Sequence, residues 1–325
     1  MPALLDRILE AHGAIRPDLL VTPLERSAGL SRLMGCDVLL KAEHLQPTGS
    51  FKIRGATNKL RVLGAGSRGG VITASTGNHG QAVARAGARA GVPVTVYVGA
   101  GTSVAKMAAI EALGAVLVVV AGPPIAAELE ARRRAEAEGV AYVSPYNDLD
   151  VVAGQGTLGV ELHEQAPGLD AVFIAVGGGG LIGGTGTALK ALGGRGGGRT
   201  KVVGVWPENS ACMLRAMEAG AVVDVVEAPT LSDGTAGAIE AGSVTLQLCR
   251  EVIDETVTVS EAAIARAMRQ VAEMERWMVE GAAGVALAGL AACAERYRGG
   301  SVAVVLCGRN IALGTFLRAV GEVGA

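Results

Sequence analysis

The chain has 325 residues, of which 50% are hydrophobic and only 3% aromatic, and its formal net charge at pH 7 is -2. This length is enough for two domains of ordinary size around a large buried core. The near-neutral charge gives no reason to expect nucleic acid or an anionic membrane as a partner. No apolar run approaches the length of a membrane span.

The first segment, residues 1–11, is predicted to form an amphipathic helix and not a signal peptide. The cysteines lie far apart in the sequence, without a C-x-x-C pair: Cys36, Cys212, Cys249, Cys293 and Cys307. Such spacing is typical of reduced thiols, and it favours neither a disulfide framework nor a zinc site. We therefore expect a cytoplasmic protein.

Apolar runs and helical segments alternate along the rest of the chain. In the first half, strands are predicted at 38–42, 71–74, 92–98, 116–120 and 140–143, and helices at 51–60, 80–90, 103–113 and 128–138. In the second half, strands are predicted at 171–176, 202–206 and 301–306, helices at 156–165, 181–192, 262–273 and 284–295, and a Gly/Arg loop at 195–199. Such alternation predicts an α/β protein with parallel sheets.

Lys52 lies where the chain passes from a strand into a helix. Pro47 and Gly49 break the preceding apolar run, and Ser50 is expected to cap the helix that follows. The positive end of the helix dipole would lower the pKa of a lysine in the first turn. An amine that deprotonates easily can form an imine with an aldehyde. Taken alone, the segment is also compatible with a solvated lysine at a helix start.

Gly177, Gly178, Gly179 and Gly180 separate a buried strand from a helix. The backbone of such a run can direct several N–H groups at one anion, and the helix adds its positive end, so the pattern indicates a phosphate site. No acidic residue follows at the distance of the dinucleotide fingerprint, and no Gly-Lys-Ser/Thr follows as in a P-loop. The alternative is a flexible tight turn.

Two further strand ends carry polar residues. The run from Ser75 to Gln81 offers hydroxyls, an amide and free N–H groups at a helix start, which suit a carboxylate. An ordinary N-cap cluster would explain one or two of these residues. Cys307 ends the last strand, where residues that face ligands lie in parallel sheets, although a buried thiol is usually a small apolar filler.

Four motifs occur in the order Ser50-Phe51-Lys52, Ser75-x-Gly-Asn78-His79-Gly80, Gly177 to Gly180, and Cys307-Gly308-x-Asn310. From about Thr22 to Asn310, the chain resembles the fold type II family of pyridoxal-phosphate enzymes, which includes serine/threonine dehydratases, serine racemase and threonine synthase. The resemblance implies two parallel-sheet α/β domains with pyridoxal 5'-phosphate in the cleft between them. Residues 1–47 and 148–325 would form the large domain and 48–147 a small mobile domain, without a C-terminal regulatory domain. A homodimer is expected.

The resemblance also implies a role for each matching residue. Lys52 would bind the cofactor aldehyde and shuttle the α-proton, with Phe51 against one face of the pyridine ring and Asn78 hydrogen-bonded to the ring oxygen. The phosphate would be held by Gly177, Gly178, Gly179, Gly180 and the Leu181 amide. Cys307 would face the pyridine nitrogen, and Gly234 and Glu280 would line the far edge of the ring. Ser75, Thr76 and His79 would bind the substrate carboxylate.

The reaction implied is the dehydration of an L-threonine or L-serine type of β-hydroxy amino acid to a 2-keto acid and ammonia. A thiol facing the ring nitrogen cannot keep that nitrogen protonated as a carboxylate would. A long-lived carbanion is then disfavoured, and β-elimination is favoured over transamination. A protein that only binds a phosphate-bearing ligand is the alternative outside catalysis, and Lys52 argues against it because binding needs no imine.

The sequence departs from the family pattern at four positions. Thr76 replaces the serine that acts as second base in serine racemase, which argues against racemisation. Trp206 stands where many relatives have a metal-binding glutamate, so we assign no metal ligand. Tyr146 and Arg309 replace smaller residues, which leaves open a bulkier β-hydroxy amino acid such as phenylserine or one derived from hydroxyectoine.

Overall fold

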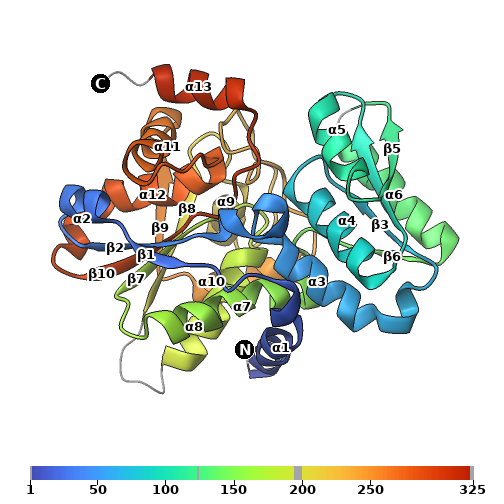
Figure 1. Ribbon diagram of the computed structural model, residues 1–325, viewed down its shortest axis with the longest axis horizontal. Helices are drawn as coiled ribbons and strands as arrows, with labels where there is room; N and C mark the ends of the chain where they lie inside the picture. The colour runs from blue at the N-terminus through green and yellow to red at the C-terminus, as the bar shows by residue number, and fades with distance from the viewer. Residues whose placement is uncertain (1, 123, 194–199, 323–325) are drawn as a thin grey trace.

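The computed structural model describes residues 2–122, 124–193 and 200–322. The chain forms two sheets, one of six strands and one of four, which lie in separate parts of the molecule (Figure 1). The predicted α/β class with parallel sheets is confirmed. The predicted Gly/Arg loop at 195–199 lies outside the described residues.

The larger sheet has the strand order β1-β2-β10-β7-β8-β9. Its strands are β1 (Leu24–Arg26), β2 (Asp37–Lys41), β7 (Ala171–Ala175), β8 (Lys201–Pro207), β9 (Glu255–Val259) and β10 (Ser301–Val305). All neighbours are parallel except β1, which pairs antiparallel with β2. Val304 of the central strand β10 lies opposite Leu40 and Phe173. These side chains are buried because helices cover both faces of a parallel sheet.

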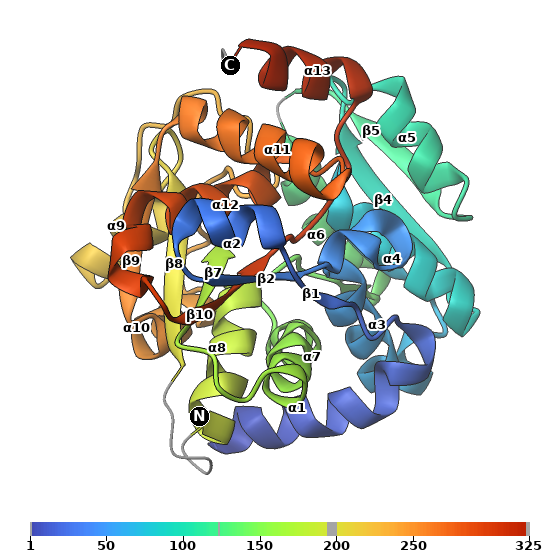
Figure 2. The same ribbon diagram turned by 60° about the vertical axis from the view of Figure 1, so that its left-hand side comes forward.

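Helices lie on either side of the larger sheet (Figures 1 and 2), with α11 and α12 on one side and α7 and α8 on the other. The helices of this part are α1 (Pro2–Ile15), α2 (Ala28–Met34), α7 (Leu149–Gln165), α8 (Gly180–Gly193), α9 (Cys212–Ala219), α10 (Val244–Val252), α11 (Glu261–Glu275), α12 (Gly281–Cys293) and α13 (Leu313–Glu322). The sequence predictions above do not include α2, α9, α10 and α13. Among the described residues, no helix combines the length and the apolar character that crossing a membrane requires.

The smaller sheet is entirely parallel and has the strand order β5-β4-β3-β6. Its strands are β3 (Val71–Ala74), β4 (Val94–Gly99), β5 (Val116–Val120) and β6 (Ala141–Tyr142), and its helices are α4 (Asn78–Ala90), α5 (Val104–Glu111) and α6 (Pro124–Glu138). The sheet falls within the predicted unit 48–147. That this unit moves as a small domain stays a prediction.

Helix α3 (Lys52–Leu63) lies between the two parts, packed against α4 on one side and α7 on the other (Figure 2). The expected cap at Ser50 was wrong. The residue before the helix is Phe51, whose side chain accepts no capping hydrogen bond. Ser50 instead adopts an extended conformation and forms an isolated bridge with Gly308. The start of α3 is therefore held by contacts with the rest of the molecule.

Candidate active site

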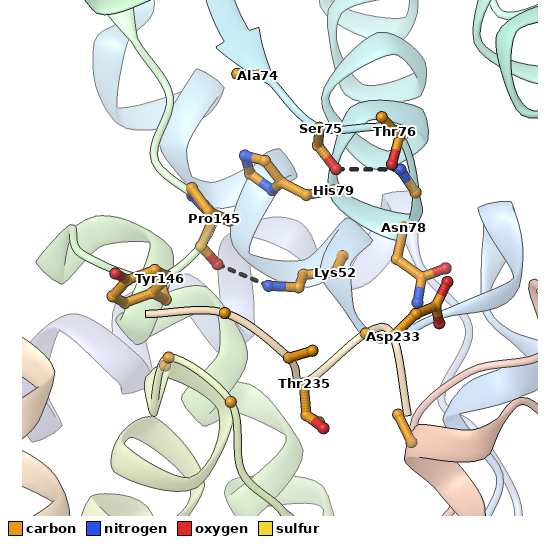
Figure 3. A pocket seen from close by; sticks show the side chains of 18 of the residues that line it. Lys52, Ala74, Ser75, Thr76, Asn78, His79, Pro145, Tyr146, Asp233 and Thr235 are labelled. Atoms are coloured by element: carbon orange, nitrogen blue, oxygen red, sulfur yellow. Dashed lines mark hydrogen bonds between the residues drawn. The ribbon is translucent and has the colours of Figure 1, made fainter. Parts of the chain in front are cut away.

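A cavity of about 710 Å³ (Figure 3) is lined by residues that follow the carboxyl ends of β3, β7 and β10. Every predicted site residue lines it: Phe51, Lys52, Ser75, Thr76, Asn78, His79, Gly177, Gly178, Gly179, Gly180, Leu181, Gly234, Glu280 and Cys307. Ligands bind at the carboxyl ends of strands in α/β proteins, where successive loops converge. The structure thus brings residues from six separate segments together at one place.

Lys52 is the first residue of α3, and its side chain extends into the cavity. Its Nζ donates a hydrogen bond of 2.8 Å to the carbonyl oxygen of Pro145 (Figure 3). Burial lowers the pKa of this amine to about 8, against the opposing effects of Cys307 and Glu280. The sequence argument named the helix dipole as the cause, whereas burial is the main cause in the structure. About a tenth of the amine is therefore unprotonated at pH 7, far more than for an ordinary lysine.

The glycine run forms a tight turn into the start of α8. Gly179 has a φ of +81°, which L side chains rarely adopt. A Cβ on Gly178 would lie 2.3 Å from the ring of Tyr146, and one on Gly177 would lie 2.9 Å from the Cα of Thr235. The first N–H groups of a helix have no acceptor within the helix. The turn thus presents N–H donors and the positive helix end to the cavity, an arrangement that suits a phosphate.

Glu280 and two asparagines form a hydrogen-bonded cluster at another wall of the cavity. Asn78 donates from Nδ2 to Glu280 Oε1 at 2.8 Å, and the Asn310 N–H donates to Glu280 Oε2 at 2.9 Å. Burial and the charge of Asp233 raise the pKa of Glu280 to about 7. The second N–H of the Asn78 amide remains available, since an amide has two. A Cβ on Gly234 would lie 3.4 Å from Glu280 Oε1, which places Gly234 at this same wall.

Cys307 follows β10 and is buried at the cavity wall. Burial, together with the nearby Glu280 carboxyl, raises its pKa well above the ordinary value for a thiol. Cys307 therefore remains a neutral thiol, which is unreactive as a nucleophile compared with a thiolate. Cys307 could therefore serve as an uncharged partner for a ring nitrogen.

The loop from Ser75 to His79 leads from β3 into α4. The Ser75 hydroxyl accepts a hydrogen bond of 3.2 Å from the Gly77 N–H. The His79 ring is buried, and its Nε2 lies 2.9 Å from the carbonyl oxygen of Val143. Because a carbonyl only accepts, Nε2 carries the proton. Burial and the charge of Lys52 lower the pKa of His79 to about 3, so the ring is neutral and offers no cation to a carboxylate.

Sequence reasoning missed two ion pairs that each have at least one partner in the cavity lining. Lys106 of α5 forms an ion pair of 3.0 Å with Asp233, and Arg132 of α6 forms one of 2.7 Å with Glu240. Both pairs join the smaller-sheet part to the loop between α9 and α10. The two residues of each pair are far apart in the sequence, so no local sequence pattern could predict that they would meet. Asn310, by contrast, was part of a recognised motif but was not assigned a role.

The arrangement fits pyridoxal 5'-phosphate in three respects. A lysine amine with a lowered pKa suits an aldehyde, and the turn before α8 suits a phosphate. The Asn78 amide and the Cys307 thiol, which line the same cavity, offer neutral partners to the polar atoms of a pyridine ring. Within the described residues, no group of three or more His, Cys, Asp or Glu side chains could hold a metal ion.

The comparisons with known proteins agree with this geometry. The model of the pyridoxal-phosphate dependent enzyme family matches residues 15–308. The L-threonine ammonia-lyase of Thermotoga maritima is 37% identical over 94% of this chain and 75% of its own length. The processed threonine deaminase isoform 2 of Solanum lycopersicum superposes with a TM-score of 0.93 at 33% identity, covering 99% of this chain and 94% of that one. Maize serine racemase superposes with a TM-score of 0.90 at 27% identity, covering 98% and 97%.

The family match spans most of the chain, and the superposed structures cover both sheets. The predicted fold type II architecture and the predicted cofactor are thereby confirmed. The roles assigned to single residues stay predictions. This chain belongs to the family of pyridoxal-phosphate dependent enzymes.

Proposed function

We propose that this enzyme is a dehydratase, or ammonia-lyase, for a β-hydroxy amino acid of the threonine or serine type. It removes water from the substrate and yields a 2-keto acid and ammonia. The observation that carries the proposal is the Lys52 amine, buried in the cavity with a pKa of about 8 and held by a carbonyl that accepts from it. The names of two relatives, the L-threonine ammonia-lyase of Thermotoga maritima and the threonine deaminase isoform 2 of Solanum lycopersicum, support the same reaction.

The cofactor, when bound, withdraws electrons from the α-carbon and so makes its proton acidic. The chain's own residues supply the rest. The start of α4, with the Ser75 and Thr76 hydroxyls, binds the substrate carboxylate through main-chain N–H groups. The His79 ring, tied to Val143, contributes by holding this loop in place. Lys52 takes the α-proton on one face of the substrate.

The start of α8 binds the phosphate and fixes the cofactor's position relative to Lys52. Phe51 would pack against the pyridine ring. The neutral Cys307 thiol would leave the pyridine nitrogen unprotonated, which would favour departure of the β-hydroxyl over reactions that need a long-lived carbanion. Glu280 holds the Asn78 amide by a hydrogen bond, and this amide would face the ring oxygen, while Gly234 would leave room at the edge of the ring.

The decisive experiment replaces the amine. Lys52→Ala should abolish both the visible absorbance of the bound cofactor's imine and keto-acid release, while circular dichroism stays that of the wild type. Borohydride reduction of the wild type, followed by peptide mass mapping, should locate the cofactor on Lys52. Lys59 is the matched control, because it lies on the same helix but pairs with Asp148 at 2.6 Å and Asp150 at 3.0 Å. Cofactor found on Lys59, or turnover by Lys52→Ala, would refute the assignment.

The substrate's side chain is to be found by measuring keto-acid release. The panel should contain L-serine, L-threonine, threo-3-hydroxyaspartate, phenylserine and 3-hydroxylated diamino acids. Tyr146 lines the cavity, and its hydroxyl accepts a hydrogen bond of 2.9 Å from the Glu240 N–H. A preference for the larger compounds would assign the bulkier substrate class, and Tyr146→Asn should then shift the preference toward serine.

We also propose that the enzyme is a cytoplasmic homodimer that serves amino-acid catabolism. All five cysteines are free and buried, which suits a reducing compartment. Sedimentation equilibrium or light scattering gives the oligomeric state directly. A monomer at micromolar concentration would remove the dimer from this proposal without touching the reaction.

A further inference from the structure

Four charged side chains lie buried together behind α3, outside the catalytic cavity. They are Lys41, Glu43, Arg54 and Glu161, and each is no more than 3% exposed. Two are positive and two are negative, so the cluster is neutral as a whole. Burying charges is costly unless each is paired and hydrogen-bonded, and these are.

Arg54 is the centre of this cluster. Its Nε and Nη2 donate to the two carboxylate oxygens of Glu43, both at 2.8 Å. Its Nη1 and Nη2 donate to the two oxygens of Glu161, also at 2.8 Å. Nη1 donates a further bond of 3.0 Å to the Thr157 hydroxyl. A guanidinium has five N–H donors, and five hydrogen bonds are made.

The acceptors of Arg54 come from two other elements of the chain. Glu43 lies in the turn that follows β2, while Thr157 and Glu161 belong to α7. Arg54 itself lies two residues after Lys52 in the first turn of α3. Two residues correspond to about 200° of rotation around a helix axis. Lys52 therefore points into the cavity when Arg54 points toward α7, and fixing Arg54 fixes the rotation that aims Lys52.

Helices α3 and α7 also pack closely against each other, at Gly55 of α3 and Gly154 of α7. A Cβ on Gly55 would lie 2.4 Å from Gln155 Nε2, and one on Gly154 would lie 2.6 Å from the carbonyl oxygen of Arg54. Rotation or sliding of α3 is limited by such close contact. Because no side-chain cap holds the start of α3, these contacts and the Arg54 hydrogen bonds hold its first turn, together with the hydrogen bond of 3.1 Å from the Phe51 N–H to the carbonyl oxygen of Cys307.

A buried ion cluster is seldom more stabilising than apolar residues of the same volume. A contribution to stability is therefore a poor explanation for the presence of this cluster. A positioning role explains the presence of Arg54 better. The planar guanidinium holds its acceptors in fixed directions, whereas an ammonium does not. We propose that Arg54 is a positioning residue for the reaction, which holds the first turn of α3 so that the Lys52 amine stays at the reacting position. The inference rests on the proposed role of Lys52.

The test compares two changes to the same cluster. Arg54→Lys keeps the charge but loses the planar donor set that anchors α3. Lys41→Met removes a buried charge whose partners, Glu161, Gln165 and the Thr22 carbonyl, all lie outside α3. Arg54→Lys should lower kcat by about tenfold to a hundredfold with KM nearly unchanged, as expected when a reacting group is misplaced by about 1 Å. Lys41→Met should keep kcat within about threefold, even though denaturant unfolding shows lost stability.

A second readout does not depend on turnover. The rate at which the cofactor-free protein forms the imine with added pyridoxal 5'-phosphate reports the position and protonation of the Lys52 amine. Arg54→Lys should slow this rate and move its pH midpoint above the wild-type value, because a loosened amine is better hydrated. Lys41→Met should leave both unchanged.

Thr157→Val covers the case in which Arg54→Lys does not fold. It keeps all four charges and removes one acceptor from Arg54, and kcat and the imine rate should fall by roughly twofold to fivefold. The proposal is overturned if Arg54→Lys, or in its absence Thr157→Val, keeps the wild-type rates, or if Lys41→Met slows them equally. If the proposed function were wrong, the wild type would release no keto acid, yet the imine rates would still separate the variants.

Discussion

Lys52 Nζ and the carbonyl oxygen of Pro145 are joined by a hydrogen bond of 2.8 Å that both charge states of the amine can make. The oxygen can accept a hydrogen bond from an ammonium or from a neutral amine, and the bond from the ammonium is the stronger one. Loss of the proton therefore weakens this contact without removing it. Burial alone favours the neutral form, and it lowers the pKa to about 8 against the opposing effects of Cys307 and Glu280.

Cofactor loading should follow this pKa. Below about pH 8 the amine is protonated and lacks the lone pair that attacks the aldehyde, so the imine rate should rise about tenfold per pH unit and then level off. Stopped-flow absorbance between about pH 6 and about pH 10 measures it. Noncovalent binding to Lys52→Ala, followed by fluorescence, is the control and should lack this midpoint. A midpoint near the ordinary lysine value of 10.5 would contradict the buried position.

Cys307 should act by its neutrality and not as a nucleophile. Its raised pKa keeps the thiol protonated, and a serine hydroxyl is equally neutral, so Cys307→Ser should keep kcat within about tenfold. Cys307→Asp introduces a carboxylate that protonates the pyridine nitrogen, and transamination products should increase. Product analysis by mass spectrometry distinguishes the two reactions. Complete inactivity of Cys307→Ser with the cofactor still bound would be incompatible with this role.

Thr76 should not serve as a second base. No hydrogen bond that activates its hydroxyl is found among the described residues, and an unactivated hydroxyl is a poor base because its pKa is far above neutrality. Incubation of the best L-substrate in deuterated water should give keto acid with under about 1% of the D-enantiomer. Chiral chromatography measures both. A D-enantiomer formed as fast as the keto acid would make the enzyme a racemase. Thr76→Ser should leave elimination largely intact.

Gly178 and Tyr146 should be energetically coupled. A Cβ on Gly178 would lie 2.3 Å from the tyrosine ring, so Gly178→Ala should cost about 1–3 kcal/mol of stability and weaken cofactor binding. Adding Tyr146→Ala should restore part of both losses, since the clash is removed. Denaturant unfolding and cofactor titration of the two single variants and the double variant provide the cycle. If the losses of the two single variants simply added up in the double variant, the Tyr146 ring would not be what excludes a side chain at Gly178.

The sequence was most informative where function depends on a short segment. Lys52, the glycine run and Cys307 were identified because each lies at a strand end within its own motif, and such junctions are recognisable locally. The predicted cap at Ser50 was wrong because pairing with Gly308, far along the chain, decides the conformation of that residue. Local propensity could not reveal such a partner.

Side-chain environments were equally hard to predict. His79 belongs to a recognised motif, yet its ring is tied to Val143 of a neighbouring strand end. The Arg54 cluster and the ion pair between Lys106 and Asp233 join segments that only the folded chain brings together. Charged residues in a sequence are usually solvated, and nothing in the pattern indicated that Arg54 is 1% exposed. Burial of charge was therefore the property that sequence reasoning missed.

The contact between Gly55 and Gly154 determines where this enzyme can be redesigned. Tyr146 lines the cavity and can be varied in a library that seeks new substrates, because it is assigned no role toward the cofactor or the substrate carboxylate. A substitution at Gly154 would instead push against the main chain of α3, and the change would displace the reacting amine whatever the substrate. Selection for new specificity should therefore randomise Tyr146 and leave the contact between α3 and α7 unchanged.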